Sequence, residues 1–254
     1  MPQLAQYIED TRDLLKDTRS GGLFWTDKQI TRYVNLARQQ VATLSGCIRI
    51  LIPGQSPFGG QSVPGTTIPG AGTPGMPITN TFQTIPGVEK YSFTFANNYV
   101  KQLNQNVKGI GDVISVSVSW GGIRPSLDWL PWEDLQAYAR SYNIGVTSYP
   151  FVWSTYGDGE RGQVWLFPIP TNALEMEWDT ICVPTDIFTN ECYDALPTPF
   201  TTYVPFYAAH LAFLNSQRYG QASTMLDLFY ANSGLARVAS DRGKTKSFYY
   251  SSYP

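Results

Sequence analysis

Residues 199–238 read PFTTYVPFYAAHLAFLNSQRYGQASTMLDLFYANSGLARV, and this stretch decides the class of the fold. Its first half, 203–219, is apolar on nearly every side, which is typical of a helix at the centre of a bundle. Pro205 either starts or kinks that helix, and we expect Gly220 to end it. A last, amphipathic helix is predicted over about 222–242.

The N-terminal segment shows the same helical period. Apolar side chains recur every three or four residues within 4–16 and again within 30–44. Thr26, followed three residues later by Gln29, forms a capping-box pattern, which predicts that the second helix begins there. Gly46 is placed to end that helix. Both ends of the chain are therefore expected to be helical.

The apolar period changes to two in the middle of the chain, which indicates β-strands. Apolar and polar residues alternate in three runs, whose apolar members are Tyr91, Phe93 and Phe95; Ile114, Val116, Val118 and Trp120; and Leu174, Met176 and Trp178. Residues 151–155 and 163–167 flank a Gly-rich turn and predict a β-hairpin, and a short helix is expected over 132–142. Such strands predict an antiparallel β-sandwich or barrel-like domain.

These patterns together predict an α+β protein. Residues 1–47 and 197–243 form a helical bundle domain, and residues 48–196 form a β domain inserted into it. Within the insert, residues 53–87 hold seven Pro, eight Gly and no charged residue, which denies them a regular helix or strand ladder. Two interpretations of this extended loop are open: a flexible surface loop, or an arm that becomes ordered on a neighbouring subunit.

Charge and composition exclude several classes of protein. Only 15% of the residues are charged and 14% are aromatic, so the chain carries enough apolar surface for a core and is not disordered. The net charge of −2 provides no basic surface for wrapping nucleic acid. The middle of the chain, residues 50–196, is acidic, with six basic and thirteen acidic side chains. Low charge combined with many aromatic residues suits a protein that buries surface against other subunits.

The cysteines and the N-terminus indicate the compartment. Cys47, Cys182 and Cys192 form no CxxC pair and cannot all be paired in disulfides, which is typical of a reducing cytoplasm. The N-terminal MPQLAQYIEDTRD lacks the features of a signal peptide. No apolar run approaches the roughly 20 residues needed to cross a bilayer, so no membrane association is expected.

Few residues are candidates for catalysis or metal binding. His210, the only histidine, lies among apolar residues, so we expect a core histidine rather than a catalytic base. A zinc set of the three cysteines and His210 is not expected, because no two of them are closer than ten residues. Asp158 and Glu160 are too few ligands for calcium. We therefore expect no cofactor and no metal.

Paired carboxylates leave one other function open. Glu175 and Glu177 point the same way from one predicted strand, and Glu133 and Asp134 begin a predicted helix. Two carboxylates beside a sugar-binding cleft could cleave glycans. The tryptophans that could stack on sugars are Trp120, Trp129, Trp132, Trp153 and Trp165. A charged strand face and a helix N-terminus explain these acids without catalysis, so we expect no enzyme and keep a carbohydrate-binding or glycan-cleaving β module as the alternative.

The C-terminal residues 244–254 have no helical period but combine cations with aromatic side chains. These are Lys244, Lys246, Phe248, Tyr249, Tyr250 and Tyr253. Aromatic and cationic side chains are common anchors at protein interfaces. The segment is either a tail that docks on a partner or a frayed terminus.

Three segments resemble the head-to-tail adaptor proteins of tailed bacteriophages, also called connector or head-completion proteins. They are the stretch 199–238 quoted above, the N-terminal WTDKQITRYVNLARQQVATLSGC, and VWLFPIPTNALEMEWDTICVP over 164–184. The shared pattern is an aromatic- and alanine-rich helix, a break at Arg–aromatic–Gly, and then an amphipathic helix. The Pro/Gly-rich loop and the large acidic β region depart from that family, so the resemblance does not imply a role for the β domain.

The resemblance implies a structural virion protein, synthesised in the host cytoplasm and located at the head–tail junction. Such proteins form a ring, usually of twelve copies, that docks on the portal protein, meets a tail or nozzle protein and continues the DNA channel. Residues 244–254 would be the portal-docking tail, and DNA would pass without sequence-specific binding. We expect the strand acids Glu175, Glu177 and Asp179 to face the lumen, where negative charge would keep DNA from adhering.

Overall fold

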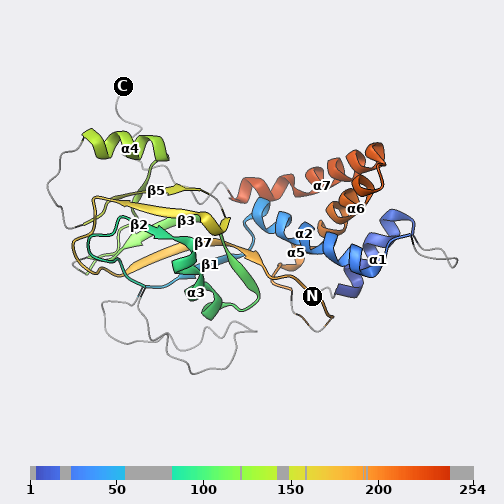
Figure 1. Ribbon diagram of the computed structural model, residues 1–254, viewed down its shortest axis with the longest axis horizontal. Helices are drawn as coiled ribbons and strands as arrows, with labels where there is room; N and C mark the ends of the chain where they lie inside the picture. The colour runs from blue at the N-terminus through green and yellow to red at the C-terminus, as the bar shows by residue number, and fades with distance from the viewer. Residues whose placement is uncertain are drawn as a thin grey trace. The chain divides into compact units, whose positions relative to one another are not determined.

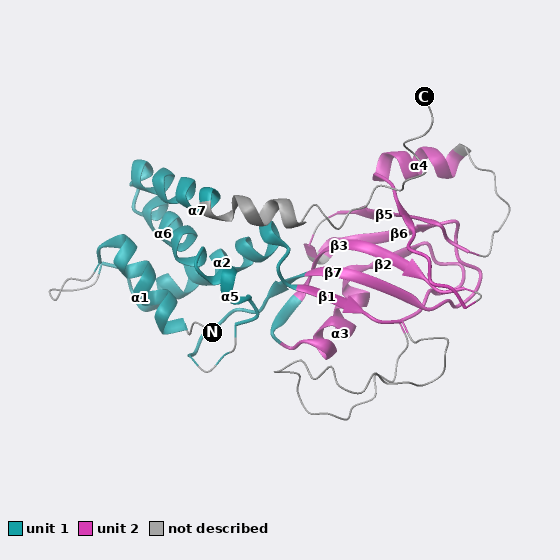
Figure 2. Cartoon of the chain, turned by 180° about the vertical axis from the view of Figure 1, so that it is seen from behind, with its two compact units in different colours: residues 1–48, 106–108, 182–242 teal, residues 49–105, 109–181, 243–254 magenta. Residues whose placement is uncertain are grey.

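The computed structural model describes residues 4–17, 24–54, 82–120, 122–141, 149–157, 159–190, 192 and 194–240. Helices and two β-sheets make up an α+β fold, which confirms the predicted fold class (Figure 1). The chain divides into two compact units (Figure 2). Unit 1 draws on both ends of the chain, within 1–48 and 182–242, together with the short segment 106–108, and unit 2 is built from 49–105 and 109–181.

Unit 1 is helical, and α6 is its central element. The helices are α1 (Leu4–Leu15), α2 (Asp27–Ser45), the short α5 (Thr198–Thr201), α6 (Val204–Asn215) and α7 (Tyr219–Ser240). Helix α6 packs against α1, α2 and α7. Its buried residues include Val204, Ala208, Ala209 and Ala212, whose small side chains allow helices to approach from several sides. The predicted central helix is confirmed, and Pro205 lies in its first turn.

The predicted ends of α2 are also confirmed. The Thr26 hydroxyl accepts a hydrogen bond from the backbone N–H of Gln29, and the Gln29 side chain accepts one from the N–H of Thr26. These bonds satisfy two backbone donors that a helix start otherwise leaves free. At the other end, Gly46 adopts a left-handed conformation with φ of 59° and donates to the carbonyl of Ala42.

The expectation that Gly220 ends the central helix is wrong. Helix α6 ends at Asn215, and Gln217 takes the left-handed conformation there with φ of 60°. The N–H groups of Gln217 and Arg218 donate to the carbonyls of Leu214 and Phe213, which closes the end of the helix. Gly220 instead lies in the first turn of α7. It does not end α6, because the bonds at Gln217 and Arg218 have already done so.

Unit 2 contains the two sheets. One has the strand order β1 (Arg49–Ile52), β7 (Met176–Pro184), β3 (Val107–Val118), and the ends of β3 and β7 extend into unit 1. The other has the order β2 (Lys90–Ser92), β6 (Gln163–Phe167), β5 (Val152–Tyr156), β4 (Asp128–Trp129). Strands β5 and β6 pair antiparallel as the predicted hairpin, joined through the short 3-10 helix Gly159–Arg161, whereas β4 and β5 are parallel. Helix α4 (Trp132–Ser141) agrees with the helix expected there.

The strand expected through Phe93 and Phe95 is wrong beyond Ser92. Strand β2 stops there, and α3 (Phe93–Leu103) begins, with the Ser92 hydroxyl accepting from the N–H of Phe95 as an N-cap. The buried face of α3 repeats at helical spacing through Phe93, Ala96 and Val100. Alternation of three aromatic residues was too short to distinguish a strand from the start of a helix.

Two aromatic residues from distant segments pack around Trp178 in the core of unit 2. The ring of Phe82 lies 5.1 Å from that of Trp178 and the ring of Phe93 lies 6.5 Å from it. All three side chains are fully buried. The backbone of Gly162 passes directly over Phe93, because a Cβ at Gly162 would lie 2.3 Å from Cε2 of that ring. Only glycine therefore lets the β5–β6 connection reach α3.

A charged network is buried in unit 1. Arg38 on α2 and Asp194, between β7 and α5, are 1% and 4% exposed, and their closest N–O distance is 2.6 Å. Asp194 also accepts from the hydroxyl of Tyr7 on α1 at 2.6 Å and from the N–H of Leu196 at 3.0 Å. Burial and the negative Asp194 raise the pKa of Tyr7, so its hydroxyl stays a donor. The guanidinium also donates to the side chain of Asn35 and the carbonyl of Thr185.

Replacement of Asp194 tests how much this network contributes to the stability of the fold. We expect Asp194→Asn to lower the free energy of unfolding by about 3–5 kcal/mol, because it leaves the Arg38 guanidinium buried without a counter-charge. Urea denaturation measures the difference. Asp186→Asn is the matched control. Within the described residues, the exposed Asp186 accepts one hydrogen bond, from the half-buried side chain of Gln39, so its replacement should cost less than about 0.5 kcal/mol. Equal losses in the two variants would contradict the assignment.

Replacement of Gly162 tests the contact with Phe93. We expect Gly162→Ala to destabilise the fold by about 1–3 kcal/mol, since the added methyl group overlaps a buried ring that has nowhere to move. Gly220→Ala is the control, because no atom lies within 4 Å of the position of its Cβ on α7. A helical glycine replaced by alanine should leave stability unchanged or raise it by up to about 1 kcal/mol. Thermal unfolding of both variants decides the prediction.

Candidate interaction surfaces

Several residues that the sequence predicts to make interactions lie outside the part of the chain that the structure describes. This applies to the whole tail segment, Lys244, Lys246, Phe248, Tyr249, Tyr250 and Tyr253, and to residues 55–81 of the Pro/Gly-rich loop. The two interpretations of that loop therefore stay predictions. Asp158 and the side chain of Glu160 are outside as well.

The predicted lumen acids form one row on β7, which we call the β7 acidic strip (Glu175, Glu177 and Asp179). Met176, Trp178 and Thr180 alternate with them and are fully buried, so the pleat of β7 places the three carboxylates together on its other face. The backbone of Glu175 itself forms an isolated bridge with Gln83 just before β7. The alternation predicted for this strand is confirmed.

Two arginines face the β7 acidic strip. Arg124 lies 2.6 Å from Glu177 and 3.9 Å from Glu175, and Arg49 of the neighbouring strand β1 forms an ion pair with Asp179. The carboxylates are half-buried, and burial raises the pKa of Glu175 while Arg124 opposes that rise. Three acids against two arginines leave a local formal charge of only −1. The arginines precede their acids by 53 and 130 residues, so the pattern of β7 alone could not show them.

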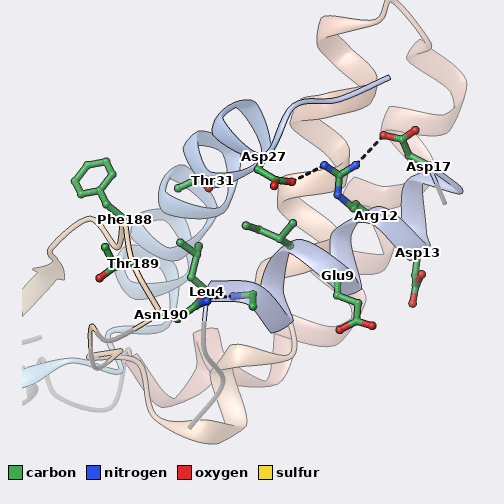
Figure 3. A pocket seen from close by; sticks show the side chains of 12 residues that line it. Leu4, Glu9, Arg12, Asp13, Asp17, Asp27, Thr31, Phe188, Thr189 and Asn190 are labelled. Atoms are coloured by element: carbon green, nitrogen blue, oxygen red, sulfur yellow. Dashed lines mark hydrogen bonds and ion pairs between the residues drawn. The ribbon is translucent and has the colours of Figure 1, made fainter. Parts of the chain in front are cut away.

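A second group of acids lines a groove in unit 1, which we call the α1–α2 groove (Figure 3). Its volume is about 560 Å³. Its apolar lining comes from Leu4, Ala5, Ile8 and Phe188, and its charged lining from Glu9, Arg12, Asp13, Asp17 and Asp27. Four carboxylates and one guanidinium thus line the groove. Sequence reasoning missed this site, although Glu9 and Asp13, four residues apart, already fall on one face of the predicted first helix.

The charged residues of the groove divide into two groups. Arg12 pairs with Asp17 at 3.1 Å and with Asp27 at 2.6 Å, as Figure 3 shows, and Asp17 also accepts from the N–H groups of Phe24 and Trp25. These contacts join the end of α1 to the start of α2. Glu9 and Asp13 are exposed and form no ion pair with any residue that the structure describes.

The opposite wall of the groove is the segment 187–190, which is anchored on both sides. Asn35 of α2 accepts from the N–H of Ile187 and donates to its carbonyl, both at 2.9 Å. The Asn190 side chain accepts from the N–H of Ala5 in the first turn of α1 at 2.8 Å. Phe188 lies between these anchors and is nevertheless 73% exposed. The anchored segment therefore presents a large apolar side chain at the wall of the groove.

The aromatic residues of unit 2 bear on the glycan alternative. Trp153 is buried, so it cannot stack on a sugar. Trp132 and Trp165 pack at 4.5 Å beside a pocket of about 200 Å³, with Lys90 4.2 Å above the Trp165 ring. Among the lining residues of this pocket, Glu89 is the one carboxylate. Glycan cleavage needs two, so this geometry gives the glycan-cleaving alternative no support.

The remaining candidate residues, the histidine and the cysteines, make contacts that belong to the fold. Nδ1 of His210 lies 2.8 Å from the carbonyl of Ala222, so the buried ring donates a hydrogen bond from α6 to α7. Cys47, Cys182 and Cys192, all within the described residues, form no disulfide there, and burial raises the pKa of Cys47. Within the described ranges no group of three or more His, Cys, Asp or Glu could hold a metal ion. None of the described helices is both long and apolar enough to cross a bilayer.

Comparison with known proteins covers nearly the whole chain. A family model described as SU10 adaptor protein matches residues 2–247. No curated protein matches the sequence. The matched range includes the helices of unit 1, both sheets of unit 2 and the first residues of the cationic, aromatic tail. The chain therefore belongs to the SU10 adaptor protein family and is a phage adaptor protein, in agreement with the resemblance found in its sequence.

Proposed function

We propose that this protein forms an oligomeric ring at the head–tail junction of the virion, beneath the portal protein. The observation that carries the proposal is membership of an adaptor family over nearly the whole chain, which implies a structural role in the virion. We further propose twelve copies in the ring, the number usual among the head-to-tail adaptors that the sequence resembles. The ring would join the capsid to a tail or nozzle protein and continue the DNA channel.

The surfaces of both units support assembly with other chains. Large apolar side chains are exposed on each: Phe24, Phe188 and Tyr219 in unit 1, and Leu51, Ile123 and Tyr156 in unit 2. Scattered apolar residues are ordinary on a monomer, but only 15% of this chain is charged, so few charges separate them. A subunit of a closed ring needs two lateral surfaces of this kind.

The segment 244–254 is our candidate for the portal contact. It offers Lys244 and Lys246 for acidic partners and four aromatic side chains for apolar pockets, without any acidic residue. Such side chains dominate the binding energy of protein interfaces. The β7 acidic strip is our candidate for the channel lining, where its residual negative charge would repel DNA.

Removal of the tail tests the portal contact. We expect complexes purified with a tagged full-length copy to show a ring capping the portal in negative-stain micrographs, and deletion of residues 244–254 to abolish capping. Replacing Ser251 and Ser252 by alanine, in the same segment, should leave capping intact because it removes no anchor. Capping that survives the deletion would refute the docking role of the tail, and isolated copies without a portal in the full-length sample would refute the ring.

Opposite charge changes test the channel lining. Glu175→Gln, Glu177→Gln and Asp179→Asn together leave two unpaired arginines on the strip, whereas Arg49→Gln with Arg124→Gln leaves three unpaired acids. Both variants break the same ion pairs and share that structural cost. We expect the first to slow DNA ejection from phage particles and the second not to slow it, because only a positive wall attracts DNA. Equal ejection rates in both would show that the strip does not face DNA.

A further inference from the structure

Among the described residues that line it, the α1–α2 groove has more acidic than basic side chains. Arg12 is already paired with Asp17 and Asp27, while the Glu9 and Asp13 carboxylates form no ion pair with any described residue. The pKa of the neighbouring Asp10 reflects these negative charges. Partial burial raises it, and the charges of Asp13 and Glu9 raise it further. A ligand for this rim should therefore be cationic.

The groove also has apolar lining, on α1 and at Phe188 of the opposite wall. Leu4 and Ile8 lie on α1, and the exposed ring of Phe188 stands on a segment that Asn35 and Asn190 hold in place. These hydrogen bonds hold the residues on both sides of Phe188 and so keep its backbone beside the groove. A ligand that covers the Phe188 ring should therefore carry an aromatic or aliphatic side chain beside its cation.

We propose that the α1–α2 groove binds residues 244–254 of this protein. That segment has two lysines followed within two residues by aromatic side chains, and no acid that the rim would repel. Lys244 and Lys246 face Glu9 and Asp13, and one of the aromatic rings at Phe248 to Tyr250 packs on Phe188 and Ile8. A groove of about 560 Å³ holds several side chains, so it takes part of the segment at a time.

This binding goes beyond the proposed portal contact. While residues 244–254 occupy the groove they cannot contact the portal, because the same side chains make both contacts. The groove thus covers the aromatic segment of subunits that have not met a portal, and a portal with higher affinity displaces it. Mutations distinguish the two contacts. Variants of the groove affect only the groove contact, whereas deletion of 244–254 removes both the groove contact and the portal contact.

The test uses a fluorescent peptide of residues 242–254 and the full-length protein. The protein carries Lys244→Glu and Lys246→Glu, so that its own tail does not compete. We expect saturable binding by fluorescence anisotropy, and at least about tenfold weaker binding after Glu9→Lys with Asp13→Lys. Phe188→Ser, which changes no charge, should weaken binding as well. Binding should also weaken as salt shortens the Debye length below about 10 Å.

A matched pair separates the groove from general electrostatics. Glu133→Lys with Asp134→Lys changes the net charge by the same amount on exposed residues of α4, and should leave the dissociation constant within about twofold. Thermal unfolding confirms that each variant is folded. No saturable binding up to roughly 1 mM peptide, or equal weakening by both pairs, would overturn the proposal. Portal capping that persists with a weakened groove would leave the proposed function intact.

Discussion

The buried ion pair between Arg38 and Asp194 ties together parts of unit 1 that are far apart in the chain. Arg38 belongs to α2, Asp194 follows β7, and the hydroxyl of Tyr7 on α1 donates to the same carboxylate. Neither charge can replace its partner with water, because both side chains are almost fully buried. The segment that leaves β7 is therefore held against α1 and α2, and with it the wall of the α1–α2 groove.

Two groups of acidic residues in this protein differ in how many of them form ion pairs. The β7 acidic strip faces Arg49 and Arg124, so most of its charge is neutralised within unit 2. In the α1–α2 groove, Arg12 pairs with Asp17 and Asp27, and the exposed Glu9 and Asp13 form no ion pair with any described residue. Unpaired charge beside exposed apolar surface favours association with a cationic, aromatic partner, whereas paired charge mainly stabilises the fold.

Much of the fold could be predicted wherever the signal was local. The capping box at Thr26, the apolar helix around Ala208 and the alternation at Met176 and Trp178 each depend on residues a few positions apart. Predictions were wrong where a local pattern allowed two structures. Phe93 and Phe95 alternate as in a strand, but the Ser92 cap begins a helix, and Gly220 resembles a stop signal although Gln217 already ends α6.

By itself, the sequence determined the fold class, most of the helices, the hairpin and the row of acids on β7, because these follow from periodicity and capping. The tertiary structure alone decided which acids are neutralised, since Arg49 and Arg124 come from segments 130 and 53 residues away from their partners. It also decided that Asn190 meets Ala5 across 185 residues and so completes a groove. Contacts of such long range depend on how the whole chain packs, and no local pattern encodes them.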